Sequence, residues 1–183
     1  MIPTREECFG LIRQYGMLPH IVRHSKLVTQ VALLIARKLD DCGCHLDLAL
    51  VEAGALLHDI TKTVSIETKE NHAETGGGLV ASLGYPAVAN IVRQHICLDP
   101  GSSEPEAITE AEVVNYADKR VKHEEVVDID ERFQDVWERY VEKIPGLQAR
   151  FEEVQLETRL LEQKIFLRID ISPEQINDFL PNP

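Results

Sequence analysis

The chain has 183 residues, of which 44% are hydrophobic and 5% are aromatic. This length suits one domain with one core, and a composition dominated by Ala, Leu, Glu, Val and Ile favours packed helices over a β-sandwich, so we expect a single all-α domain over residues 1–183. The formal net charge of -12 argues against broad electrostatic binding to nucleic acid or anionic lipid, because such binding depends on clustered Lys and Arg. We therefore expect no nucleic-acid scaffold among the partners.

The first part of the chain predicts a short helix followed by a long one. Thr4 and Glu7 have the spacing of a capping box, and the apolar residues after them continue a short helix. Pro19 is expected to begin the next helix, in which apolar residues recur at threes and fours as far as Leu39. This periodicity predicts one buried face, and His24 lies on it.

The next segment, residues 46–57, is almost wholly apolar and predicts a buried central helix. This helix ends on His58 and Asp59, so two titratable side chains are expected at the buried end of a core helix. Polar groups in such a place are costly unless something binds them, and the pair is the first indication of a functional site. The polar residues 62–70 predict a loop or a short turn.

Two further helices are each expected to carry a histidine. Residues 71–83 predict a helix that ends before a glycine, with His72 in its first turn. Residues 86–96 predict an apolar helix with His95 near its end. The glycine run 76–78 lacks the Lys-Ser/Thr ending of a phosphate-binding loop and lies inside a helical pattern, so we interpret it as a site of close helix packing.

The rest of the chain predicts a loop and more helices. Residues 99–105 have the composition of a loop, and residues 109–112 form a second capping-box pattern at the start of the helix that carries Asp118. One or two amphipathic helices should follow, with a break at residues 145–146 and a last helix from residues 172–173.

Polar residues in otherwise apolar contexts are therefore expected to converge on one core: His24, His58, Asp59 and Asp118. A lone histidine in a helix is more often structural than a ligand, but the combination points to a metal. Imidazoles and carboxylates suit Fe, Mn, Zn, Co or Ni, and no cysteine falls in these segments, which disfavours a structural zinc site. A bound metal can lower the pKa of water to about 7, which suits hydrolysis at neutral pH.

Three segments carry a resemblance to a known family: Arg23-His24-Ser25, residues 56–62 and residues 117–120. In order and spacing they resemble the successive motifs of the HD superfamily of metal-dependent phosphohydrolases. The resemblance covers about residues 18–125 and leaves a C-terminal helical extension of about residues 126–183. It implies an HD-type helical bundle whose bound divalent metal activates water against a phosphoester or phosphoanhydride of a nucleotide or small phosphorylated metabolite.

Two more segments resemble the extra histidine motifs of superfamily members that hold two metals: residues 72–76 and 93–95. This resemblance implies that Asp59 bridges two ions, that His72 and His95 complete the second one, and that the remaining ligands hold the first. The motif order is also that of the bacterial HD-type symmetrical dinucleoside-tetraphosphatases. Their downstream signature is not evident here, so the substrate does not transfer.

Three cations near these motifs are candidate substrate-binding residues: Lys62, Arg93 and Arg120. Each could bind a substrate phosphate and offset negative charge in the transition state, and we expect Lys62 to act in catalysis together with Asp59. The alternative for each cation is a solvated surface residue or an ion-pair partner on an acidic protein.

Two other functions stay open on the sequence alone. A di-iron oxygenase of the same superfamily would use a six-ligand site of this kind, and a regulatory nucleotide-binding module would use the helical domain without catalysis. The presence of every candidate ligand weighs against the second alternative. No apolar run has the length of a signal peptide or membrane span, so we expect a cytoplasmic protein without a membrane partner. A homodimer through the C-terminal helices stays open, although no heptad run supports it.

Overall fold

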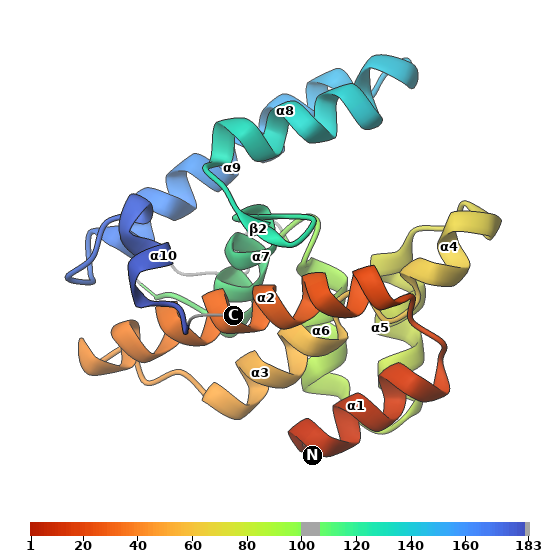
Figure 1. Cartoon of the computed structure of the whole chain (residues 1–183), viewed down its shortest axis with the longest axis horizontal. Coiled ribbons are helices and arrows are strands. Elements are labelled where there is room, and N and C mark those ends of the chain that lie inside the picture. Colours follow the sequence, from red (N-terminus) through yellow and green to blue (C-terminus); the bar gives the residue numbers. More distant parts are fainter. Residues whose placement is uncertain (100–106, 182–183) are drawn as a thin grey trace.

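The computed structural model describes residues 1–99 and 107–181 and has an all-α fold, as predicted (Figure 1). Within these ranges the only strands form one small antiparallel hairpin, β1 (Val121–Lys122) and β2 (Glu125–Val126). None of the helices in this part of the chain is long and apolar enough to cross a membrane. The loop predicted over residues 99–105 lies outside the described residues except for its first position.

The helices that come before the hairpin build the body of the molecule. The long α2 crosses the centre of Figure 1 and packs along α3 and α7, while α5 packs against α6. In chain order these helices are α1 (Arg5–Gln14), α2 (Pro19–Asp41), α3 (Leu48–Leu57), α4 (Lys62–Thr68), α5 (His72–Ser82), α6 (Pro86–Gln94) and α7 (Glu110–Lys119).

Both predicted capping boxes are present. The hydroxyl of Thr4 accepts a hydrogen bond from the backbone N–H of Glu7, and the Glu7 carboxylate accepts one from the backbone of Thr4. Thr109 and Glu112 make the same reciprocal pair at the start of α7. These bonds satisfy N–H groups that the first helical turn leaves without partners, which fixes where α7 begins.

The prediction of a loop over residues 62–70 was wrong, because this segment contains α4. The helix begins directly after the turn at residues 58–61 and ends at Lys69, which has a left-handed φ of 63°. It buries no residue, and its apolar side chains Val64 and Ile66 are exposed. A surface helix without a buried face has no amphipathic pattern, so its sequence resembles that of a loop.

After the hairpin, the chain forms an extension that packs back on α2 and α7. Leu161, Ile165 and Ile176 of the extension belong to the same buried cluster as Val28 of α2 and Tyr116 of α7. In Figure 1, α8 and α9 run side by side above the body of the molecule. The elements of the extension are α8 (Ile129–Arg139), the 3-10 turn η1 (Val141–Lys143), α9 (Gln148–Phe166), the 3-10 turn η2 (Pro173–Gln175) and α10 (Ile176–Phe179).

Candidate metal centre

The fold brings together all six predicted metal ligands, which come from five separate segments. His24 lies on the buried face of α2, and His58 and Asp59 follow the last residue of α3. The other three lie at the first residue of α5, at the C-cap of α6 and in the last turn of α7: they are His72, His95 and Asp118. Helix ends and inner faces therefore converge on one point inside the molecule.

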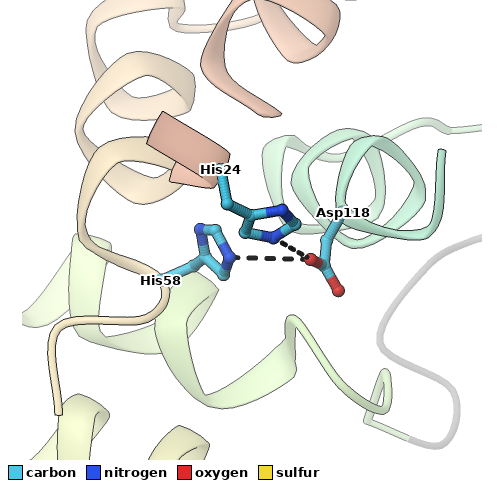
Figure 2. Close-up of side chains that lie close together, drawn as sticks. All are labelled: His24, His58 and Asp118. Carbon is cyan, nitrogen blue, oxygen red and sulfur yellow. Dashed lines mark hydrogen bonds and ion pairs between the residues drawn. The ribbon is translucent and has the colours of Figure 1, made fainter. Parts of the chain in front are cut away.

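One half of the site is formed by His24, His58 and Asp118 (Figure 2). The Nε2 atom of His24 lies 2.9 Å from Oδ1 of Asp118, and the Nε2 atom of His58 lies 3.6 Å from the same oxygen. All three residues are buried, and one ligand atom from each lies within 4.8 Å of the others. Figure 2 shows both imidazoles directed toward the carboxylate.

Asp59 connects this half of the site to the other half through its two oxygens. Its Oδ2 lies 3.3 Å from Nε2 of His58 and 4.0 Å from Nε2 of His24. Its Oδ1 lies 3.1 Å from Nε2 of His72 and 3.6 Å from Nε2 of His95. The two carboxylate oxygens therefore face different pairs of histidines.

Three of the imidazoles are held by backbone carbonyl groups. The Nδ1 atoms of His24, His58 and His95 lie 2.9, 2.8 and 2.6 Å from the carbonyl oxygens of His123, Ala55 and Val92, respectively. In this geometry Nδ1–H donates to the carbonyl, which leaves the lone pair on Nε2 directed into the cluster. This is the orientation that a histidine needs to bind a metal through Nε2.

The donor set and its spacing fit a transition metal. Ligand atoms at about 2.1 Å from one ion, separated by angles near 90–110°, lie about 3.0–3.4 Å from each other. The contacts of Asp59 with His58 and His72, at 3.3 and 3.1 Å, have this spacing. In addition, Nε2 of His58 and Oδ1 of Asp59 are buried without a hydrogen-bond partner among the described residues. Buried polar atoms without partners are costly, and a bound cation would satisfy both.

The electrostatics of the centre favour charged carboxylates and shift the pKa values of His58 and His95 in opposite directions. Burial by itself would raise the pKa of Asp59, but His58 and Lys62 hold it well below its usual range. Burial would lower the pKa of His58, but Asp59 and Asp118 raise it to about 10. For His95, burial dominates and lowers the pKa to about 3. A metal and a proton therefore compete for Nε2 of His58.

The position of His95 depends on residues that the sequence analysis did not identify. The buried Lys119 donates from Nζ to the carbonyl oxygen of His95 at 3.0 Å and to Oδ1 of Asn115 at 2.9 Å. Asn115 in turn donates to the carbonyl of Gln94 at 2.7 Å. These bonds fasten the end of α6 to α7. A lysine and an asparagine on the buried face of a helix were the available signal, since such residues require internal partners.

The three predicted substrate-binding cations lie in different places. Nζ of Lys62 lies 2.8 Å from Oδ2 of Asp59, so this lysine reaches the centre. Arg93 is exposed on α6 and lies across Gly77 of α5. It does not line the pocket to which Lys62, His72 and His95 contribute.

The prediction that Arg120 binds substrate does not agree with the structure. Arg120 is 4% exposed, and its guanidinium donates to the hydroxyl of Tyr116 at 2.7 Å and to the carbonyls of Val127 and Pro173 at 2.7 and 3.1 Å. It also lies 3.4 Å from the carboxylate of Glu162 in α9. Arg120 therefore joins the extension to α7 instead of facing the metal centre.

The chain matches one family model and several curated proteins. The model of the HD domain family matches residues 21–122. The tRNA (cytidine(56)-2'-O)-methyltransferase of Thermoplasma volcanium is 33% identical over 146 residues, which cover 70% of this chain and 41% of that protein. Ribonuclease Y of Thermus thermophilus is 28% identical over 180 residues, which cover 92% of this chain and 29% of that protein. The chain thus spans less than half the length of these curated relatives, and no solved structure matches it significantly.

Proposed function

Because this chain belongs to the HD domain family, we propose that it is a metal-dependent phosphohydrolase that cleaves a phosphoester or phosphoanhydride of a small phosphorylated molecule. The observation that carries the proposal is the orientation of the histidine side chains in the centre. Imidazoles fixed through Nδ1 present Nε2 to Asp59 and Asp118, and the two oxygens of Asp59 face different pairs of histidines.

The arrangement supports two metal ions. His24, His58 and Asp118 would hold the first, His72 and His95 would hold the second, and Asp59 would be a ligand shared by the two groups. Bound metal would supply a hydroxide at neutral pH by lowering the pKa of a coordinated water to about 7.

Lys62 and Asp59 have distinct parts in this proposal. Lys62 is held by Asp59 at 2.8 Å and also lines the cavity where substrate would enter. Its ammonium group would bind a phosphoryl oxygen and offset the negative charge that grows in the transition state. Asp59 is fully buried and positions the ligands around it.

A small substrate differs from the RNA that the names of the relatives mention. The chain covers 41% of the Thermoplasma methyltransferase and 29% of the Thermus ribonuclease Y, so the activities of the whole proteins do not transfer. A net charge of -12 disfavours an extended polyanion, whereas a single phosphate can be held locally by cations.

Elemental analysis of the purified protein, followed by phosphate release from phosphate monoesters, nucleotides and a short RNA, tests the proposal. We expect close to two transition-metal ions per chain and phosphate release from a small substrate. Asp59→Asn should lose both, whereas His45→Asn should lose neither, because His45 is exposed and lies outside the centre. Absence of both metal and phosphate release would refute the function. Iron together with oxygen consumption and no phosphate release would identify an oxygenase instead.

A further inference from the structure

A cavity of about 350 Å³ lies beside the candidate metal centre. One end is lined by residues of the centre, among them His72, His95 and Asp118. Another part of the lining comes from the extension, outside the residues 21–122 that match the family model, and includes Phe133, Val136, Phe151 and Val154. The lining therefore combines polar groups of the metal centre with apolar side chains and arginines of the extension, as expected for a ligand with a charged head and an apolar body.

Arg132 of α8 also lines this cavity, and its charge is poorly compensated. Its side chain is 15% exposed, its Nε is buried without a partner among the described residues, and its ion pair with Asp135 is long, at 3.4 Å. A half-buried guanidinium with an unused donor, lining the same cavity as candidate metal ligands, is suited to bind an anion.

The other arginines that line the cavity already have partners. Arg150 donates to Glu153 at 3.0 Å and lies 3.6 Å from Glu157. Arg139 lies 3.3 Å from the carboxylate of Asp135, and its guanidinium also lies over the ring of Tyr140, 5.2 Å from the centroid. Both side chains are nearly half exposed, so solvent screens their charge. Arg132 is therefore the arginine best placed to bind a substrate anion.

We propose that this cavity is the substrate site and takes a small phosphate ester of an aromatic group, with Arg132 binding the phosphate and the walls of α8 and α9 holding the ring. The inference rests on the proposed phosphohydrolase function. The volume lies near the lower end of the range for ligand pockets, about 300–1,000 Å³, which suits a small molecule. The rings of Phe133 and Phe151 are packed edge to face with centroids 5.3 Å apart, and a third ring can join such a pair favourably.

The binding of two phosphonates, which have no P–O ester bond to cleave, tests the proposal. Calorimetry on the metal-loaded protein should give an affinity for benzylphosphonate about 10- to 100-fold higher than for methylphosphonate, because only the former buries a ring. Trp137 is the only tryptophan in the chain, and its ring lies 5.5 Å from that of Phe151. Its fluorescence should therefore change with benzylphosphonate over the same concentration range, in a readout independent of catalysis.

Two variants separate the two parts of the proposal. Arg132→Gln should weaken both phosphonates about 10-fold or more, because a charge-assisted hydrogen bond to the shared anion is lost. Val154→Phe should fill part of the apolar wall and remove the preference for benzylphosphonate, while methylphosphonate binds as before. Arg159→Gln is the matched control, since Arg159 lies in the same extension, pairs with Asp130 and does not line the cavity.

Equal affinities for the two phosphonates, or a benzyl preference without any response of Trp137, would overturn the assignment of the apolar wall. Unchanged binding in Arg132→Gln would overturn the role of Arg132. These failures are distinguishable from failure of the proposed function. Phosphate release from a substrate with no ring preference would leave a phosphohydrolase with a different substrate class, whereas no phosphate release from any ester would refute the function itself.

Discussion

His72 and His95, which are 23 positions apart in the sequence, face each other through their Nε2 atoms at 3.2 Å. Two neutral imidazoles at this distance share at most one hydrogen, so a cation between them is the arrangement that uses both lone pairs. We predict that His72→Ala removes one of two metals per chain, since His24, His58 and Asp118 do not depend on His72. Elemental analysis after gel filtration measures the count, with the exposed His20→Ala as control. Two metals retained in His72→Ala would place the second ion elsewhere.

The convergence of His24, His58 and Asp59 was predictable because each one interrupts an apolar pattern. His24 falls on the buried face of a periodic helix, and His58 and Asp59 end a helix that is apolar throughout. A polar group in such a position must find a partner, so sequence alone indicates a site there.

The partners of the ligands were not predictable in the same way. The carbonyl of His123 orients His24 from 99 positions away, and the two meet only because an unpredicted hairpin turns the chain at that point. His123 has a φ of 54°, and nothing in its side chain marks this function of its backbone. The prediction that Arg120 binds substrate was wrong for a related reason. Proximity to a motif in the sequence does not show which side of α7 a side chain occupies.

The role of Arg120 as a link between α7 and the extension leads to a second prediction. Arg120→Ala leaves the hydroxyl of Tyr116 and the carboxylate of Glu162 without their buried cation. We expect the free energy of unfolding to fall by about 3 kcal/mol, because the Tyr116 hydroxyl and the carbonyls of Val127 and Pro173 lose the donor that they share. Chemical denaturation measures this, and the substrate KM of the remaining folded protein should not change.

A surface ion pair provides the control for that measurement. Arg23 and Glu124 form a pair in which both side chains are about half exposed, at 54% and 44%. Arg23→Ala should therefore leave the unfolding curve essentially unchanged, because solvent screens the charges of an exposed pair. If Arg120→Ala instead raised KM and left the unfolding curve unchanged, the original assignment of Arg120 to substrate binding would be restored.

The glycine run in α5 predicts opposite effects at neighbouring positions. A Cβ at Gly77 would lie 2.3 Å from Cγ of Arg93 and 3.1 Å from the carbonyl oxygen of Ala89, so α6 would have to move. A Cβ at Gly78 would meet nothing within 4 Å. We expect Gly77→Ala to lower the free energy of unfolding by about 1–3 kcal/mol and Gly78→Ala to raise it by up to about 1 kcal/mol. Thermal unfolding distinguishes them, and similar shifts for both would contradict close packing of α5 on α6.

The metal-free protein should be most stable near pH 6.5. The pKa of His58 is raised from 6.5 to about 10, so its contribution is fully present below pH 6.5 and is lost as the pH rises toward 10. The pKa of His95 is lowered from 6.5 to about 3, so its contribution is present above pH 6.5 and is lost as the pH falls toward 3. On each side the free energy of unfolding should fall by up to about 1.4 kcal/mol per pH unit per histidine.

Bound metal should prevent the fall in the free energy of unfolding at alkaline pH. The metal takes the place of the proton at His58 and binds more tightly as that proton leaves. Thermal unfolding between pH 5 and pH 9, with chelator and with added manganese or zinc, measures both curves. We expect the metal-dependent rise in the unfolding midpoint to grow steadily with pH. His58→Gln should abolish the alkaline decline of the metal-free protein and the stabilisation by metal together, since both require the same imidazole. A metal-induced rise that is the same at every pH would show that metal does not compete with the proton on His58.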